Sequence, residues 1–512
     1  MKISGPLLKK VDRNSDLYKK LATAHPKIAQ KDSTIWGSKA AAEAAVRLNW
    51  VDLPQASLSL LPEISALGEK FKDRNRFVLC GMGGSSLGPE VIAQSNGREI
   101  FIFDSTDPHY AKHAIGEDLS KTLVIVSSKS GSTIETSSQR ALFEGKFIDA
   151  ALDPKEHILF VTDPGSPLDL EVRAAGFTVV NADPNVGGRF SVLSAFGLLP
   201  SALIGVDIEK LLNDAQKEKE GFLTDPSVIL DIAYLLIAET KQYIAFTDNQ
   251  SNFPGLSDWI EQLIAESTGK DSVGRLPIAT ENAKVAKIGG ALTVSFAGTG
   301  TDLLVEGELG AQFIFWEWVT ALIGVGLKID PFNQPNVTEA KEQTAACLGE
   351  WGNQLPAFTP DCIDSGTEIF GDGQSLKDAL ATFIEDVKEG GYIAIMAYLD
   401  RRDDAKIAEL RSLLSEKSGR PTSFGWGPRF LHSTGQFHKG GQKNGSFLQI
   451  TGGTSVDYEI PGRPFTLKTL LFAQAIGDNR ALATRKYPLL RLHLQNRSAG
   501  IDQLLAAARS LS

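Results

Sequence analysis

Two short stretches of the sequence place hydroxyl side chains with glycine or lysine directly after a run of apolar residues. SSKSGSTIET (127–136) follows TLVIV, and GMGGSSLGPE (81–90) follows RFVLC. Glycines let backbone N–H groups approach an anion, hydroxyls donate to its oxygens, and a following helix presents its positive end. Serine and threonine also cap helices and turns, which would explain one such cluster more easily than two. The pair of stretches therefore predicts a phosphate site.

The phosphate predicted here is not that of a nucleotide. The dinucleotide fingerprint requires a third glycine at the position of Ser86, and the sequence contains no GxxxxGK[ST] motif. STGK (267–270) lacks the upstream glycine of a P-loop. A small phosphorylated molecule is the expected ligand.

Arg189 and Glu266 are candidates for the reacting groups. Arg189 lies in VGGRFS (186–191), between a glycine pair and a helix start, where a guanidinium can meet an anion or a developing oxyanion. Gln262 and Glu266 are four residues apart in a helical pattern and share one face. A surface arginine and a solvated glutamate are the alternatives for these residues.

Two later segments add candidates for proton transfer. Gln334 and Lys341 are seven apart in DPFNQPNVTEAK (330–341), with a helix expected to open at Pro335. PRFLHSTGQFHKGG (428–441) contains His432 and His438, and histidine titrates near neutral pH.

No metal site and no cofactor are expected. His109 and His113 are spaced four apart, but no third ligand lies near them in the sequence, so we interpret them as surface residues. The three cysteines, Cys80, Cys347 and Cys362, are too scattered for a disulfide framework or a zinc site and fit a reducing compartment.

Charge and hydropathy limit the classes of binding partner that we expect. The chain has 512 residues and a net charge of −10, which argues against a nucleic-acid partner because such proteins carry a basic face. The N-terminus lacks the apolar core of a signal peptide, and the most apolar stretch (311–326) contains Glu317 and is short for a membrane span. We expect a cytoplasmic protein with a small-molecule substrate and no membrane partner.

The elements that must hold these residues follow a βαβ rhythm. Apolar runs alternate with helical patterns from residue 76 to about 183, as in a parallel sheet covered by helices. A second series starts at 242–248 and continues at 291–298 and 301–307. The expected division is a helical segment (1–70), a first α/β domain (71–220) and a second (221–512). Whether 390–512 forms its own sheet is left open.

Six segments together resemble the phosphoglucose isomerase family, which interconverts glucose 6-phosphate and fructose 6-phosphate. They are GMGGSSLGP, SSKSGSTIET, VGGRFS, QLIAESTGK, DPFNQPNVTEAK and LHSTGQ. The resemblance implies two sugar-isomerase domains, each with a parallel sheet flanked by helices. It also implies a homodimer in which the histidine is delivered across the interface.

The resemblance assigns a role to each candidate. Glu266 would be the base that moves a proton between C2 and C1, Arg189 would stabilise the enediolate, and Lys341 and His432 would open the sugar ring. The residues expected to bind the substrate are Ser85, Ser128, Lys129, Ser130, Thr133, Gln262 and Gln334.

The order of the segments departs from the commonest family members, in which the histidine segment lies between the glutamate and lysine segments. Here the order is Glu266, Lys341, His432. The segment 464–485 looks like the helix that follows the histidine in those members, which favours a permuted second domain over a lost histidine. This arrangement resembles the isomerase portion of transaldolase–isomerase fusions.

Several alternatives remain open. A non-catalytic sugar-phosphate sensor would keep the serine-rich stretch and need neither Glu266 nor Lys341, because a fold alone does not fix function. An isomerase that also accepts mannose 6-phosphate, or an aminosugar isomerase, would share the same motifs. The choice between His432 and His438 for ring opening rests on the permuted alignment.

Overall fold

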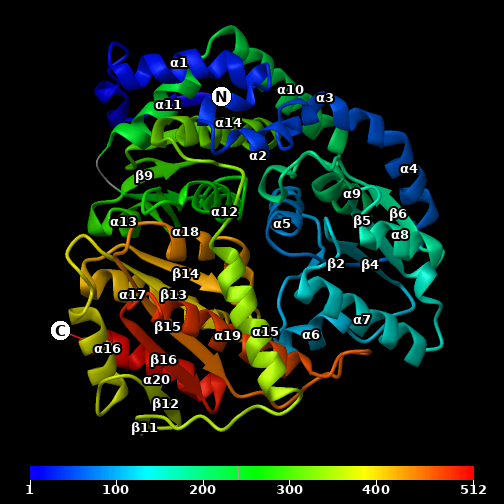
Figure 1. Ribbon diagram of the computed structural model, residues 1–512, viewed down its shortest axis with the longest axis vertical. Helices are drawn as coiled ribbons and strands as arrows, with labels where there is room; N and C mark the ends of the chain where they lie inside the picture. The colour runs from blue at the N-terminus through cyan, green and yellow to red at the C-terminus, as the bar shows by residue number, and fades with distance from the viewer. Residues whose placement is uncertain (240–241, 512) are drawn as a thin grey trace.

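Three β-sheets, each covered by helices, make up the computed structural model, which describes residues 1–239 and 242–511. In Figure 1 the first sheet lies on the right, the second at the upper left and the third at the lower left. The range 221–512 expected for the second domain includes residues 240, 241 and 512, which lie outside the described part. The boundary expected near residue 220 falls inside helix α10 (Ile208–Thr224), so the division there stays a prediction.

The first sheet is fully parallel, with the strand order β3-β2-β4-β5-β6. Its strands are β2 (Arg76–Cys80), β3 (Phe101–Phe103), β4 (Thr122–Ser127), β5 (Ile158–Thr162) and β6 (Thr178–Asn181). All five strands predicted from the apolar runs are confirmed. The order changes direction between β2 and β4, and open α/β sheets bind ligands outside the carboxyl ends of strands at such a point.

Helices cover both faces of this sheet because successive side chains along a strand point to opposite sides. Leu79 of β2 belongs to the same core cluster as residues of α4 (Leu61–Lys70), α5 (Leu87–Ser95) and α9 (Ala195–Leu203). Its neighbours Val78 and Cys80 belong to a second cluster with α6 (Pro108–Ile115), α7 (Ile134–Asp149) and α8 (Pro167–Ala174). The predicted α/β class with a parallel sheet flanked by helices is confirmed.

The second sheet has the order β1-β10-β9-β7-β8, with β1 antiparallel to β10 and the other strands parallel. The bounds are β1 (Lys2–Ser4), β7 (Tyr243–Thr247), β8 (Leu276–Ala279), β9 (Leu292–Ser295) and β10 (Leu303–Glu306). The strands predicted at 242–248, 291–298 and 301–307 are confirmed. Strands β1 and β8 were missed because β1 has no apolar run and β8 includes Pro277.

The N-terminal segment lies against two of the sheets. Its helices are α1 (Asp16–Ala29), α2 (Ala41–Ala45), α3 (Leu53–Ala56) and α4, of which α1 contacts α11 (Ser227–Ala238) while α4 contacts α9. Within residues 33–48, Gly37 has a φ of 95° and ends a short 3-10 helix (Ser33–Trp36), so only α2 is α-helix there.

Helix α14 (Leu309–Leu327) is the core helix of the second sheet's region. It packs against α10, α11 and α12 (Leu256–Thr268). By length and composition it could cross a membrane, as could the α10 and α11 pair, which is bent by 85°, but 94% of the apolar window of α14 is buried inside the molecule. An all-round apolar helix in this setting is explained by core packing.

The third sheet answers the question about residues 390–512, whose strands form a sheet separate from the second one. Its order is β11-β12-β16-β15-β13-β14; β12 is antiparallel to both of its neighbours, β11 and β16, and the other pairs are parallel. The strands are β11 (Cys362–Asp364), β12 (Thr367–Phe370), β13 (Tyr392–Tyr398), β14 (Thr422–Trp426), β15 (Gly445–Gly452) and β16 (Leu489–Leu494). The remaining helices of residues 283–509 are α13 (Ala283–Ala286), α15 (Val337–Trp351), α16 (Leu376–Glu385), α17 (Glu409–Ser418), α18 (Gly435–Gly440), α19 (Leu467–Ala483) and α20 (Arg497–Arg509).

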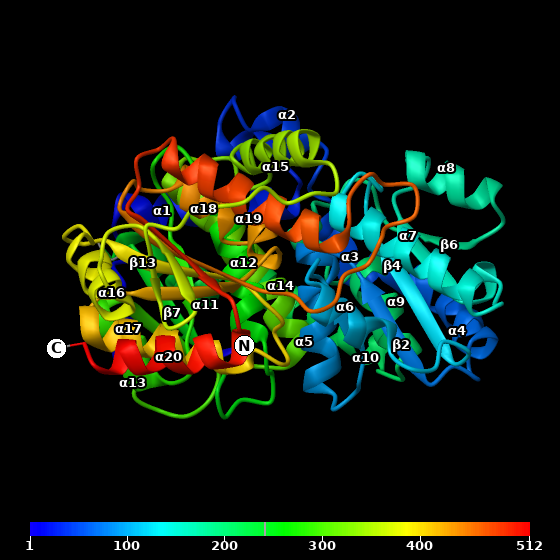
Figure 2. The same ribbon diagram turned by 90° about the horizontal axis from the view of Figure 1, so that it is seen from below.

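Helices α15 and α19 join the three sheets. They lie side by side in both views (Figures 1 and 2). Residues of α19 share a core cluster with the strands of the first sheet, and α18 contacts α12. Segments that are far apart in the sequence therefore converge beside the carboxyl ends of β2 and β4.

Candidate active site

A cavity of about 210 Å³ lies where the turns after β2 and β4 meet. All the residues that the sequence analysis assigned to the site, except Ser130, line this cavity: Ser85, Ser128, Lys129, Thr133, Arg189, Gln262, Glu266, Gln334, Lys341 and His432. The first sheet, α12 and α15 all contribute to it, so the candidates form one site.

The glycines after β2 allow the segments to approach each other closely. Gly83 has a φ of 57°, and a Cβ there would lie 2.6 Å from Gln262 Nε2 and 2.9 Å from His432 O. A Cβ on Gly84 would lie 2.0 Å from the carbonyl oxygen of Gly188. Side chains at these positions would push the surrounding segments apart, so the site requires glycine here.

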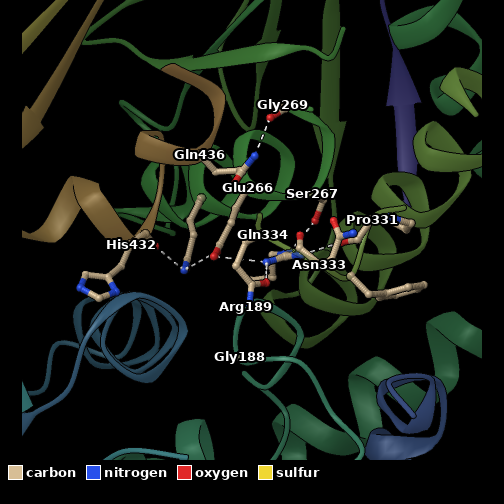
Figure 3. A network of polar contacts seen from close by, with 12 residues as sticks. Gly188, Arg189, Glu266, Ser267, Gly269, Pro331, Asn333, Gln334, His432 and Gln436 are labelled. Carbon is tan, nitrogen blue, oxygen red and sulfur yellow. Dashed lines mark hydrogen bonds and ion pairs between the residues drawn. The ribbon is translucent and has the colours of Figure 1, made fainter. Parts of the chain in front are cut away.

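Arg189 and Glu266 face each other as a buried ion pair. Arg189 Nη1 lies 3.2 Å from Glu266 Oε1, and both side chains are largely buried. The guanidinium also donates through Nε to Ser267 Oγ at 2.9 Å and through Nη1 to Gln334 Oε1 at 3.1 Å (Figure 3). A guanidinium fixed by several acceptors is well placed to stabilise an anion that forms near the carboxylate.

Carbonyl groups of the loop before α15 complete the surroundings of Arg189. Its Nη2 donates to Pro331 O at 2.8 Å and to Asn333 O at 3.0 Å (Figure 3). Lys270, which is 3% exposed, donates to the carbonyls of Asp330 and Asn333. Burial, together with the charge of Arg189, lowers the pKa of Lys270 well below its usual range. Lys270 lies in the quoted STGK, but sequence reasoning gave it no role.

Gln262 connects the glutamate to the histidine segment. Its Nε2 lies 3.3 Å from Glu266 Oε2 and donates to the carbonyl oxygen of His432 at 2.8 Å. Its Oε1 is buried and has no hydrogen-bond partner among the described residues. An acceptor without a partner at the edge of a cavity can receive a hydrogen bond from a ligand hydroxyl group.

The serine-rich stretch after β4 presents hydroxyl groups and a helix start to the cavity. Thr133 is the N-cap of α7, yet its side chain makes no capping hydrogen bond. Lys129 is already occupied, since its Nζ lies 2.8 Å from Asp163 Oδ2 and 2.7 Å from Val186 O. Ser130 is exposed and outside the cavity lining, with its Oγ 2.7 Å from Ser132 Oγ.

His432 is backed by a carboxylate that the sequence analysis did not single out. His432 Nε2 lies 3.0 Å from Glu135 Oε1, and Glu135 Oε1 also accepts from Gln474 Nε2 at 2.6 Å. Thr106 Oγ1 in turn donates to Gln474 Oε1 at 2.6 Å. Burial by itself would raise the pKa of Glu135, but the charge and hydrogen bond of His432 outweigh it and hold that pKa below its usual range.

His438 lies away from the cavity, in an apolar cluster. Its Nδ1 is 2.9 Å from the Tyr392 hydroxyl oxygen, its ring stacks on Tyr392, and its residue is 3% exposed. Burial, with a smaller contribution from Lys439, lowers its pKa to about 3. Of the two histidines left open by the sequence, His432 is the one placed at the cavity.

Gln436 and Lys341 complete the surroundings. Gln436 Nε2 donates to Gly269 O at 2.8 Å (Figure 3). It also donates to Asn336 Oδ1 at 2.8 Å, and so ties the end of α12 to the start of α15. Lys341 lies on α15, and its ammonium group makes no hydrogen bond or ion pair with any described residue. Its ammonium group can therefore donate to a ligand in the cavity, while its charge also helps to lower the pKa of Glu135.

The source of the histidine differs from the expectation. The resemblance implies that a partner subunit delivers it, whereas here His432 of the same chain lines the cavity together with Glu266 and Lys341. The reason is that the segment carrying His432 follows β14 of the third sheet, and α18 then packs on α12. One chain thus supplies all the candidate side chains of the cavity.

Residues 63–302 match the model of a family described as phosphoglucose isomerase. A glucose-6-phosphate isomerase of Campylobacter jejuni is 34% identical over 250 residues, covering 46% of this chain and 62% of the relative. A glucose-6-phosphate isomerase of Thermus thermophilus is 34% identical over 241 residues, covering 44% and 57%. The chain thus spans about three fifths of the length of these two curated relatives. The resemblance found in the motifs is confirmed over this part of the chain.

A solved structure supports the same fold. The crystal structure of a glucose-6-phosphate isomerase from Chlamydia trachomatis has a TM-score of 0.53 and 19% identity, covering 68% of this chain and 88% of that chain. The family match contains Arg189, Gln262 and Glu266 but ends before Lys341 and His432. The position of these last two residues rests on the geometry of the cavity.

Proposed function

We propose that this chain is an aldose–ketose isomerase that interconverts glucose 6-phosphate and fructose 6-phosphate. The observation that carries the proposal is the Arg189–Glu266 pair, 3.2 Å apart, in one cavity with the phosphate-type turns after β2 and β4. A sensor would need the turns alone. A carboxylate and a guanidinium held against each other beside those turns add a base and an anion-stabilising group.

The proposed reaction uses each group in turn. Ser85, Ser128 and Thr133, with the start of α7, hold the phosphate. Glu266 removes the proton from C2, and the negative charge moves onto the enediolate oxygens beside Arg189. The hydroxyl proton passes from O2 to O1, and Glu266 returns its proton to C1, which leaves the carbonyl group at C2.

Ring opening precedes this proton transfer. We assign it to His432, which would donate a proton to the ring oxygen as the ring C–O bond breaks, while the anomeric hydroxyl loses its proton to water and becomes the carbonyl group. The ammonium of Lys341 would stabilise the negative charge that develops on the ring oxygen before that proton arrives. Gln262 Oε1, which has no hydrogen-bond partner among the described residues, would accept a hydrogen bond from a sugar hydroxyl. Gln334 holds Arg189 in place through its Oε1.

We also propose that the protein works in the cytoplasm as a homodimer, in glycolysis and gluconeogenesis. The three cysteines are free thiols, which suits a reducing compartment. The cavity itself does not depend on a second chain, since its candidate side chains come from one polypeptide. Light scattering on the purified protein measures the oligomer directly, and activity that persists on dilution below dimer dissociation would show that one chain suffices.

The test is a coupled assay for glucose 6-phosphate formed from fructose 6-phosphate, with mannose 6-phosphate and an aminosugar phosphate run alongside. Glu266→Gln should lower turnover by roughly two to four powers of ten, since it removes the general base. It should still bind an open-chain sugar-acid phosphate that resembles the enediolate. Ser267→Ala, next to Glu266 and inside the Arg189 network, gives a comparison in which the carboxylate is kept.

Three results would contradict the proposal. No product from any of the sugar phosphates would favour the sensor. Activity that chelation abolishes and a divalent ion restores, in a chain that a thermal melt shows to be still folded, would show that these side chains are not sufficient for the reaction. Exchange of the substrate C2 hydrogen with solvent at the parent rate in Glu266→Gln would show that another residue is the base.

A further inference from the structure

His113 meets two aspartates across the boundary between the first and third sheets. It lies on α6, beside the first sheet, and Asp400 and Asp403 follow β13 of the third sheet. His113 Nε2 is 2.9 Å from Asp403 Oδ2 and 3.5 Å from Asp400 Oδ2. The three ligand-type atoms all lie within 4.8 Å of one another. None of these residues lines the cavity of the candidate active site.

Buried polar contacts fix the two segments relative to each other. Arg497 Nη2 donates to Asp107 Oδ2 at 2.6 Å, at the start of α6, and its Nη1 donates to Asp404 Oδ2 at 3.0 Å. Arg401 Nε donates to the Tyr110 hydroxyl oxygen of α6 at 2.7 Å. The backbone around the three ligand-type atoms is therefore held in place by other residues.

Asp400 carries a carboxylate oxygen that lacks a donor. The residue is 0% exposed, and its Oδ1 accepts from the backbone N–H of Arg402 at 2.8 Å and of Asp403 at 3.3 Å. Its Oδ2 is buried, has no hydrogen-bond partner among the described residues, and points toward His113. A buried carboxylate oxygen without a donor, directed at an imidazole nitrogen, is available to bind a cation placed between the two groups.

We propose that His113 Nε2, Asp400 Oδ2 and Asp403 Oδ2 bind a divalent transition-metal ion, with Zn²⁺ the best match. Bonds of about 2.1 Å to nitrogen and oxygen place neighbouring ligands about 3.0–3.4 Å apart. The observed separations of 2.9 and 3.5 Å from His113 Nε2 bracket that range. An imidazole with two carboxylates suits Zn²⁺ better than Mg²⁺, which prefers oxygen ligands alone.

The ion would link the first sheet to the third. The side chains of His113 and Asp403 are 32% and 62% exposed. Water can therefore fill the coordination positions of the ion that the three protein ligands leave open. Its role is to stabilise the packing of α6 on the segment after β13. A ligand that binds the folded state and not the unfolded state stabilises the folded state.

The test is a calorimetric titration of the full chain with Zn²⁺ after chelator treatment and dialysis, repeated with Mg²⁺. One Zn²⁺ per chain should bind, and Zn²⁺ should raise the melting temperature. His113→Gln and Asp403→Asn should each weaken binding by about tenfold or more. The side chains of His113 and Asp403 are partly exposed, so these variants should fold. With Co²⁺ as a probe, a visible absorption band should appear in the parent and be lost in both variants.

His109→Gln is the matched control. His109 lies one turn earlier on the same helix, and its Nε2 accepts from the backbone N–H of Ser455 at 3.3 Å. Zn²⁺ binding should be unchanged in this variant. The proposal is overturned if Zn²⁺ does not bind, if Mg²⁺ binds equally well, or if binding survives in both His113→Gln and Asp403→Asn. In those cases the group is only an imidazole–carboxylate pair.

Discussion

His432 Nε2 lies 3.0 Å from Glu135 Oε1, so the histidine at the cavity has a buried carboxylate behind it. The hydrogen bond fixes the orientation of the ring. The other ring nitrogen, Nδ1, makes no hydrogen bond with any described residue. A carboxylate in this position fixes the tautomer and the orientation of the imidazole, as it does in catalytic triads. The pair suggests that Glu135 positions His432 for ring opening.

Glu135→Gln should therefore slow turnover of the cyclic substrate by about 10- to 100-fold, since a hydrogen bond to a charged group contributes about 1.5–3 kcal/mol. Affinity for an open-chain sugar-acid phosphate should stay close to that of the parent. Glu135→Asp should recover part of the activity, and the pH profile of kcat should move in Glu135→Gln. If Glu135→Gln weakens binding of the open-chain sugar-acid phosphate as much as it slows turnover of the cyclic substrate, Glu135 has a purely structural role.

His432→Ala should lower kcat on the cyclic substrate by about two to four powers of ten, because it removes the proposed acid/base group. His438→Ala should instead lower the melting temperature, since His438 packs on Tyr392 in the apolar cluster, and the folded variant should keep most of its activity. Steady-state kinetics and thermal melts on both variants make the comparison. A greater loss of kcat in folded His438→Ala than in His432→Ala would reverse the assignment.

Thr133→Ala should raise KM by about 10- to 100-fold with kcat nearly unchanged, because its hydroxyl would contact a phosphate that does not react. Ser130→Ala should raise KM less, since Ser130 Oγ lies 2.7 Å from Ser132 Oγ and outside the cavity lining. Measuring both constants for the two variants separates binding from chemistry. A larger rise in KM for Ser130→Ala than for Thr133→Ala would mean that the loop rearranges around the ligand.

The stability of Glu317→Gln, compared with that of the parent protein, should increase as the pH rises. Both carboxyl oxygens of Glu317 are buried without a hydrogen-bond partner among the described residues, and burial raises its pKa well above the usual range. The folded state thus holds a proton that the unfolded chain releases above about pH 4.3, and stability falls by up to about 1.4 kcal/mol per pH unit until the folded pKa is reached.

Melting temperatures of the parent and Glu317→Gln at about pH 5 and about pH 8 test this expectation. The difference in favour of the variant should grow with pH. Glu63→Gln, on the exposed side of α4, is a suitable control and should show no such trend. A constant difference across the pH range would show that Glu317 does not titrate differently in the folded and unfolded states.

Much of the first sheet could be predicted from sequence, because its strands are buried on both faces and form continuous apolar runs such as TLVIV. Strands without a continuous apolar run gave no such signal. Strand β8 has four residues and includes Pro277, and β14 contains Gly425, so neither has the composition of a typical strand. The position of β1 at the edge of the second sheet depends on a partner strand about 300 residues later.

The residue types that could do the chemistry were visible in the sequence, because the turns after β2 and β4 and the face shared by Gln262 and Glu266 are local features. Which of two histidines reaches the cavity, and which carboxylates meet histidines, became visible in the folded chain. Glu135 and His432 are 297 positions apart, and His113 and Asp403 are 290 apart. Local periodicity reports which face of an element is buried, whereas contacts over such separations are set by how the three sheets pack together.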